Sequence, residues 1–145
     1  MKDVKILYVE DTYQDPLETD PYYEAFLKKG YKTKLVSTGE DAWKCLTSEA
    51  YDCIVLDIML PRGEGNNMPD QILQYDSGVF LLKSLKTGKF PLNTIGRVIV
   101  ASAVADLRAM ETIKELYKEI PYFEKPFYPE DLTEAIEQLM GMSDR

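Results

Sequence analysis

The stretch Cys53-Ile54-Val55-Leu56-Asp57 decides the fold, because four consecutive apolar residues end abruptly in a carboxylate. A short apolar run of this kind is typical of a strand buried on both faces of a parallel sheet. Two other segments have the same form: Ile6-Leu7-Tyr8-Val9 runs into Glu10-Asp11, and Val98-Ile99-Val100-Ala101 runs into Ser102. The carboxyl ends of parallel strands lie at one edge of the sheet, where α/β proteins bind ligands. The sequence therefore predicts that these polar groups converge there.

Strand-like and helix-like segments alternate five times along the chain. Apolar or alternating runs predict strands at residues 4–9, 32–37, 53–56, 97–101 and 122–123. Capping residues and first-turn prolines or acids mark the starts of helices. They stand at Asp20-Pro21, Thr38-Gly39, Asp106 and Pro129-Glu130-Asp131. Five β–α units joined by right-handed crossovers predict an α/β fold, a doubly wound five-stranded parallel sheet with helices on both faces.

Length and composition limit the number of domains, the cellular location and the partners that can be expected of this chain. Its 145 residues are the length of one domain, expected over 1–145, and no repeat or low-complexity tract divides it. No apolar run approaches the length of a membrane span, and the N-terminal residues lack the apolar stretch of a signal peptide. A cytoplasmic location without a membrane partner is expected. The net charge of −8, from 25 acidic and 17 basic residues, argues against direct nucleic-acid binding by this domain.

Histidine is absent from the chain. Its absence excludes Ser-His-Asp and Cys-His catalysis and any histidine-ligated zinc or iron site. The metal chemistry that remains is oxygen-ligated and suits Mg²⁺, Mn²⁺ or Ca²⁺. Cys45 and Cys53 lie in predicted regular structure and are expected to be buried, reduced thiols.

The acidic residues at the strand ends are candidates for a metal and phosphoryl site. A lone aspartate at a strand end is usually a solvated turn residue, but Asp57 is predicted to meet Glu10 and Asp11. Carboxylates this close repel one another unless a cation is present, and Mg²⁺ commonly takes one or two carboxylates, waters and a phosphate oxygen. Asp57 would then attack phosphorus and form an acyl phosphate.

A hydroxyl and an ammonium are predicted at the same edge. Ser102 could donate a hydrogen bond to a phosphoryl oxygen, and Lys125 could balance charge on the transferring group. Pro126 disfavours helical geometry at Lys125 and raises the chance of a cis peptide bond. Each residue alone could equally be an ordinary strand-end serine or surface lysine, so the functional interpretation depends on the combination.

Four motifs, in order on five β–α units, resemble those of two-component response-regulator receiver domains of the CheY-like superfamily. They are Leu-Tyr-Val-Glu-Asp at 7–11, Val-Leu-Asp-Ile-Met-Leu-Pro at 55–61, Val-Ala-Ser-Ala at 100–103 and Phe-Glu-Lys-Pro-Phe at 123–127. The resemblance runs nearly from end to end. It implies a flavodoxin-like sheet with strand order 2-1-3-4-5.

The resemblance also implies a role for each candidate residue. Asp57 would accept a phosphoryl group from a histidine kinase or a histidine phosphotransfer protein. Mg²⁺, with Mn²⁺ as a substitute, would be held by oxygen ligands from Glu10, Asp11, Asp57 and the backbone carbonyl of Met59. Ser102 and Lys125 would bind the phosphoryl oxygens.

The expected output is conformational. Ser102 and Tyr122 stand where such proteins carry their switch residues, and a local charge event would bias them between two states. The domain is expected not to be a turnover enzyme and to assist only its own phosphorylation and dephosphorylation. A downstream protein target or output domain is implied but not named by the sequence, and a homodimer through the last two helices is possible.

One departure from the family pattern is an inserted loop at about 62–77. A loop of this length could gate access of the phosphodonor or dock a partner, or be an inert surface excursion. Three rival functions fit the sequence less well than a phosphorylated receiver. A haloacid-dehalogenase-type phosphatase needs an acid where Met59 stands, an FMN module needs a phosphate-binding loop where Glu10-Asp11-Thr12-Tyr13 stands, and a degenerate receiver would act only by binding proteins.

Overall fold

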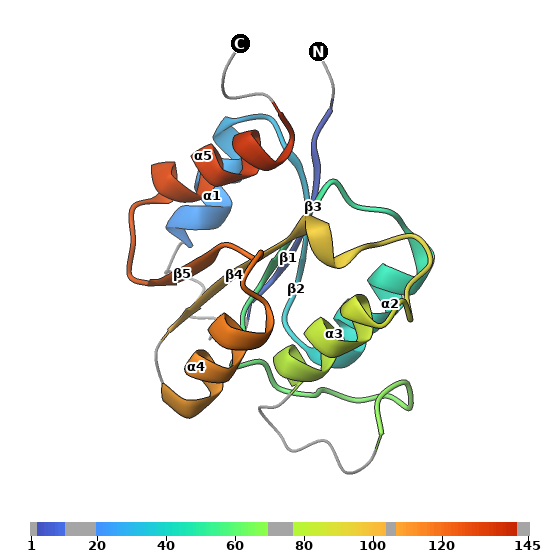
Figure 1. The fold of residues 1–145 in the computed structure, drawn as a ribbon. Helices are drawn as coiled ribbons and strands as arrows, with labels where there is room; N and C mark the ends of the chain where they lie inside the picture. Colours follow the sequence, from blue (N-terminus) through green and yellow to red (C-terminus); the bar gives the residue numbers. More distant parts are fainter. Residues whose placement is uncertain (1–2, 11–19, 70–76, 104–106, 142–145) are drawn as a thin grey trace.

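A computed structural model describes residues 3–10, 20–69, 77–103 and 107–141 (Figure 1). Its centre is a five-stranded sheet of order β2-β1-β3-β4-β5, in which every neighbouring pair is parallel. The strands are β1 (Lys5–Val9), β2 (Lys32–Val36), β3 (Cys53–Leu56), β4 (Val98–Ala103) and β5 (Tyr122–Lys125). Both the doubly wound parallel sheet and the strand order 2-1-3-4-5 are confirmed.

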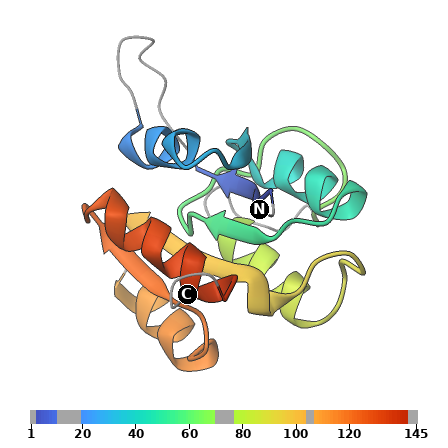
Figure 2. The same ribbon diagram turned by 90° about the horizontal axis from the view of Figure 1, so that it is seen from above.

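Helices cover both faces of the sheet, as the crossover rule requires. They are α1 (Pro21–Lys28), α2 (Gly39–Ser48), α3 (Ser77–Lys86), α4 (Leu107–Leu116) and α5 (Pro129–Leu139), with a short 3₁₀ helix η1 (Ile95–Arg97) before β4. Figure 2 shows α1 and α5 together on one side of the sheet and α2, α3 and α4 on the other. The domain therefore has three layers and two apolar cores.

The two cores explain why the central strands are apolar at every position. In β3, Ile54 and Leu56 pack toward α2, α3 and α4, whereas Cys53 and Val55 pack with Phe26 of α1 and residues of α5. Successive side chains of a strand point to opposite faces, so a sheet covered on both sides needs apolar residues throughout.

Helix α1 begins where the capping pair predicts. The Asp20 carboxylate accepts hydrogen bonds from the backbone N–H groups of Tyr22 and Tyr23, at 2.9 and 3.1 Å, and Pro21 is the first helical residue. The other oxygen of Asp20 accepts a bond from the Tyr8 hydroxyl in β1 at 2.8 Å. One side chain thus caps α1 and ties it to the central sheet.

The boundaries of β1, β2, β4 and β5 differ from the sequence-based expectation by one or two residues. Arg97 belongs to η1, and β5 continues beyond Phe123 so that Lys125 is its last residue. The apolar pattern stops at Phe123, but the ladder does not depend on side-chain polarity, and Ala103 of β4 stays in register with Lys125. The predicted cap of α4, Asp106, lies outside the described residues.

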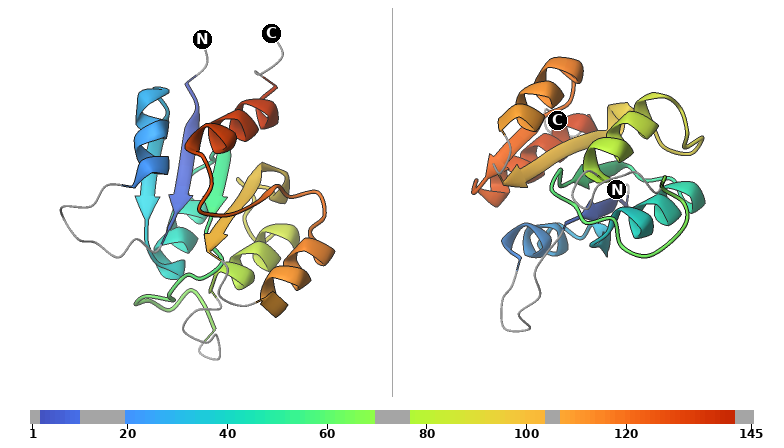
Figure 3. Two further views of the ribbon diagram at one scale, coloured as in Figure 1. Left: turned by 90° about the vertical axis from the view of Figure 1, so that its left-hand side faces the viewer. Right: turned by 90° about the horizontal axis from the view of Figure 1, so that it is seen from below.

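The strands all point toward one end of the molecule. Figure 3 shows that the connection leaving β3 lies at this end, whereas β1 begins and α5 ends at the opposite end. Within the described residues no helix is long and apolar enough to cross a membrane. Both cysteines are free thiols; Cys53 is buried, as predicted, and Cys45 is half-buried.

Candidate functional site

Four of the predicted site residues meet at the carboxyl edge of the sheet. Glu10 follows β1, Asp57 follows β3, Ser102 lies near the end of β4 and Lys125 ends β5. Glu10, Asp57 and Ser102 are 5%, 7% and 1% exposed, and Lys125 is half-buried. Charged groups are rarely buried unless they are paired or bind an ion, so this concentration marks the edge as a site.

Asp57 is held in place by its neighbours. Its Oδ1 atom accepts a hydrogen bond from the Ser102 hydroxyl at 2.7 Å and another from the backbone N–H of Met59 at 3.0 Å. Its own N–H donates to the carbonyl of Val9 at 2.9 Å, which sets it beside the end of β1. These bonds orient the carboxylate at the mouth of the central strand, as a nucleophile requires.

Lys125 pairs with Glu10 across the edge of the sheet. Its ammonium forms an ion pair with Glu10 Oε1 and lies 5.4 Å from the centre of the Tyr22 ring. Burial lowers the pKa of Lys125 to about 8, and the adjacent Glu10 carboxylate favours the charged form. The sequence predicted an ammonium beside Asp57. The structure places this ammonium at the same edge of the sheet as Asp57, in an ion pair with Glu10, whose buried carboxylate needs a compensating charge within reach. The Lys125–Pro126 peptide bond is cis.

The donor set fits a hard divalent cation. The Glu10 and Asp57 carboxylates directly follow the paired strands β1 and β3, and the backbone of Met59 lies two residues after Asp57. Within the described ranges, no three histidine, cysteine, aspartate or glutamate side chains gather closely enough to bind a metal. The third predicted carboxylate, Asp11, lies outside those ranges. Glu10 and Asp57 offer the oxygen ligands that Mg²⁺ prefers.

Tyr122 lies on the α4 side of the sheet. It is half-buried at the start of β5, in register with Val100 of β4. The Lys114 ammonium of α4 lies 5.0 Å from its ring centre. Burial raises the pKa of the Tyr122 hydroxyl, and the Glu124 and Asp57 carboxylates raise it further. The ring thus lies between α4 and β5, the strand that carries it and ends at Lys125.

The sequence analysis missed Glu40, a fully buried carboxylate in the first turn of α2. Acidic residues are common in first helical turns because their charge interacts favourably with the helix dipole. A glutamate at this position therefore gives no sign in the sequence that it is buried. Only the glycine-rich composition of the segment after Pro61 hints that the chain approaches another element closely.

Gly78, the second residue of α3, packs directly on the phosphoacceptor loop. A Cβ atom at this position would lie 2.5 Å from the carbonyl oxygen of Ile58 and 2.7 Å from that of Asp57. Both are backbone atoms, which cannot move aside as a flexible side chain can. Glycine at this position therefore lets α3 begin against the loop that carries Asp57.

We expect Gly78→Ala to lower the free energy of unfolding by about 1–3 kcal/mol, because an added methyl group overpacks a closed contact. It should also change the backbone amide NMR signals of Asp57 and Met59. Gly96→Ala is the control, since among the described residues a Cβ there meets only Thr94 Oγ1, at 3.8 Å. Urea unfolding of both variants measures the effect. Equal free energies of unfolding for the two variants would show that the loop can move away from the added methyl group without losing stability.

Comparison with known proteins gives the family. The model of the response regulator receiver domain matches residues 6–137. A curated relative, sporulation initiation phosphotransferase F of Bacillus subtilis (strain 168), is 27% identical over 142 residues, which cover 98% of either chain. The receiver domain of the Francisella response regulator 1452 is 25% identical, with a TM-score of 0.67 and coverage of 96% of this chain and 98% of that one.

A third likeness concerns the fold and a bound metal. The receiver domain of the sensor histidine kinase PA1611 from Pseudomonas aeruginosa PAO1 was solved with a magnesium ion coordinated in its active-site cleft. It is 23% identical, with a TM-score of 0.61, over 97% of this chain and 99% of that one. With the family model covering nearly the whole sheet and its edge residues, this chain belongs to the family of response regulator receiver domains of two-component signalling.

Proposed function

We propose that this receiver domain is a phosphorylation-dependent switch, in which Mg²⁺-dependent phosphorylation of Asp57 changes its conformation and its partner binding. The phosphodonor is a histidine kinase or a histidine phosphotransfer protein. The observation that carries the proposal is the Asp57 carboxylate, which is buried, oriented by Ser102 and Met59, and at the same edge of the sheet as the Lys125–Glu10 pair.

The proposed reaction is transfer from a phosphohistidine. An oxygen of Asp57 forms a bond to phosphorus while the P–N bond breaks, and the donor imidazole leaves with the bonding pair and takes a proton from solvent. Lys125 supplies positive charge near the phosphoryl oxygens, and Ser102 supplies a hydrogen bond. Glu10, Asp11, Asp57 and the Met59 carbonyl would hold Mg²⁺ or Mn²⁺, which would neutralise charge on the transferring group when bound.

The same contacts suggest how the switch works. In the unmodified protein the Ser102 hydroxyl donates to Asp57 Oδ1. Phosphorylation places new acceptor oxygens on Asp57, and Ser102 then donates to one of them. Tyr122 is paired to β4 two residues before Ser102, at Val100, so its ring follows the movement of this strand. The output is a conformational change of the face near α4 and β5, not a released product.

Several proposed properties follow from the family and the composition. The domain is not an enzyme in the turnover sense; it acts in the cytoplasm, and its partners are proteins, not nucleic acid or membrane. The name of its B. subtilis relative, a phosphotransferase, supports a role in phosphoryl transfer. The partner that reads the switch is a downstream protein or an output domain, and dimerisation with a second copy would be a further means of output.

The test is intact-protein mass spectrometry after incubation with acetyl phosphate and MgCl₂. We expect one phosphoryl adduct, which Asp57→Asn or a chelator removes. Asp41→Asn is the control, since it removes the same charge from an exposed position in α2. An adduct that survives in Asp57→Asn would refute the assignment of the phosphoacceptor. Absence of any adduct in the wild type would instead indicate a receiver that acts by protein binding alone.

A further inference from the structure

Glu40 is a buried charge outside the proposed phosphoacceptor site. Its side chain in the first turn of α2 is 0% exposed. Its two oxygens accept different bonds: Oε1 from the backbone N–H of Asn67 at 3.0 Å and Oε2 from that of Met68 at 2.8 Å. The Nε atom of Arg62 lies 3.7 Å from Oε2. These charge-assisted bonds offset the large free-energy cost of burying the carboxylate.

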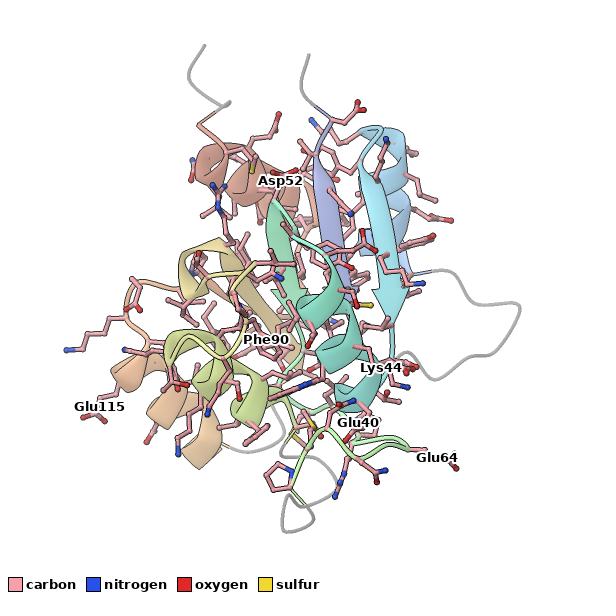
Figure 4. The ribbon with its side chains drawn as sticks, turned by 90° about the vertical axis from the view of Figure 1, so that its right-hand side faces the viewer. Glu40, Lys44, Asp52, Glu64, Phe90 and Glu115 are labelled. Carbon is pink, nitrogen blue, oxygen red and sulfur yellow. The ribbon has the colours of Figure 1, made fainter. Side chains whose placement is uncertain are left out.

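Glu40 binds a defined segment, residues 61–68, which we call the clasped segment. Its start is fixed by backbone bonds from α2, because Gly39 N–H donates to the Pro61 carbonyl at 2.8 Å and Glu40 N–H to the Arg62 carbonyl at 2.9 Å. Its end is fixed by the Glu40 carboxylate and by Arg62 Nη2, which donates to the Met68 carbonyl at 2.7 Å. Figure 4 shows Glu40 at the junction of α2 with this segment, whereas Glu64 points outward from it.

Glycines allow this close approach. A Cβ at Gly65 would lie 2.5 Å from Glu40 Oε1, and one at Gly63 would lie 2.5 Å from Thr38 Cβ. Both glycines have positive φ angles, of 150° and 78°, which other residues rarely adopt. Met68 is buried at the end of the segment. The first part of the predicted insertion is therefore packed on α2, while 70–76 lie outside the described residues.

The clasped segment continues directly from the phosphoacceptor loop. Between Asp57 and Pro61 the chain makes two short-range bonds, Met59 N–H to Asp57 Oδ1 and Leu60 N–H to the Ile58 carbonyl. Leu60 is fully buried. On the other side, Gly78 of α3 packs against the Asp57 and Ile58 carbonyls. Residues 57–60 are thus fixed between α3 and a segment that is itself fixed to α2.

Ionisation of Glu40 agrees with this arrangement. Burial would raise its pKa, but the Met68 and Asn67 N–H groups and the Arg62 guanidinium outweigh burial and hold the pKa below its usual value. The carboxylate is charged at neutral pH and bonds most strongly in that form.

We propose that Glu40 is a positioning residue of the phosphoacceptor site, which fixes the clasped segment to α2 and thereby holds the Asp57 carboxylate and the Met59 carbonyl in the arrangement that binds a divalent cation. The inference rests on the proposed function for its cation. Glu40 touches neither the cation nor the phosphoryl group. Its effect passes through the backbone from Pro61 to Asp57, as outer-shell residues tune metal sites elsewhere.

The test compares Glu40→Gln with Glu64→Gln, which alters an exposed acid of the same segment. In Glu40→Gln, amide hydrogen exchange of Asn67, Met68 and Met59 without metal should rise about tenfold or more, while exchange in β3 stays as in the wild type. The dissociation constant for Mg²⁺, followed by NMR shifts of the Asp57 and Met59 amides, should rise about tenfold. Glu64→Gln should behave as the wild type.

The outcomes separate this inference from the proposed function. Faster exchange at Asn67 and Met68 with unchanged Met59 exchange and Mg²⁺ affinity would overturn it, because Glu40 would then be only a loop anchor. If wild-type protein shows neither Mg²⁺ shifts nor a phosphoryl adduct, the proposed function fails, and Met59 exchange alone decides whether Glu40 positions the loop. If Glu40→Gln does not fold, Arg62→Met, which removes the bond to the Met68 carbonyl, gives the same readouts.

Discussion

Replacing Lys125 by methionine is expected to slow phosphorylation of Asp57 by acetyl phosphate by about 10²–10³-fold, the effect of removing one preorganised charge from a phosphoryl or oxyanion site. Lys125 ends β5 at the edge where Glu10 and Asp57 are buried, and its ammonium is held by the Glu10 carboxylate. In a buried site the effective dielectric constant is low, so an ammonium stabilises developing negative charge far more than it would in water. Methionine keeps an unbranched side chain of similar length and loses the charge together with the N–H donors of the ammonium.

The initial rate of adduct formation, measured by mass spectrometry under saturating Mg²⁺, gives the effect. Lys83→Met is the matched control, because Lys83 is exposed on α3 and the substitution removes the same charge. Thermal unfolding should confirm that both variants are folded. A Lys125→Met protein phosphorylated at the wild-type rate would refute a role of this ammonium in phosphoryl transfer and leave it a structural partner of Glu10.

Asn93→Asp is expected to destabilise the fold by about 2–4 kcal/mol at neutral pH, since buried groups left without partners cost about 1–3 kcal/mol each. Asn93 is 3% exposed. Its amide nitrogen donates to the Leu46 carbonyl at 2.9 Å and to the Glu49 carbonyl at 2.7 Å, and its oxygen accepts from Tyr51 N–H at 2.9 Å. An aspartate keeps the acceptor but replaces both donors with a negative charge that faces two carbonyl oxygens.

The penalty should decrease as pH falls. Burial and the two carbonyls disfavour the charged form, so the pKa of the introduced carboxyl is raised in the folded state and stability is lost as pH rises through it. A protonated carboxyl can also donate one of the lost bonds. Urea unfolding at neutral and acidic pH measures this. The control is Asn66→Asp in the exposed part of the clasped segment, expected within about 0.5 kcal/mol of the wild type. Equal stability of the two variants would contradict the bonding assigned to Asn93.

The sheet and its functional edge could be predicted from the sequence because both follow from local patterns. Each central strand is a short apolar run that ends in a polar residue, and Asp57 and Ser102 mark two of these ends. Parallel topology then places the ends of these strands at one edge of the sheet, independently of how the side chains pack. The prediction that Glu10, Asp57, Ser102 and Lys125 share that edge needed no knowledge of packing, and the structure confirms it.

Tertiary structure alone decided which polar groups are buried and which groups they form hydrogen bonds or ion pairs with. Glu40 and Asn93 look like ordinary surface residues in the sequence, because their partners lie far along the chain: Asn67 and Met68 are 27 and 28 residues from Glu40, and Leu46 is 47 from Asn93. The partner of Lys125 was decided in the same way, since reach and burial select Glu10. Periodicity reports which face of an element is apolar, whereas the cost of burying a charge depends on groups that only the folded chain brings within hydrogen-bond distance.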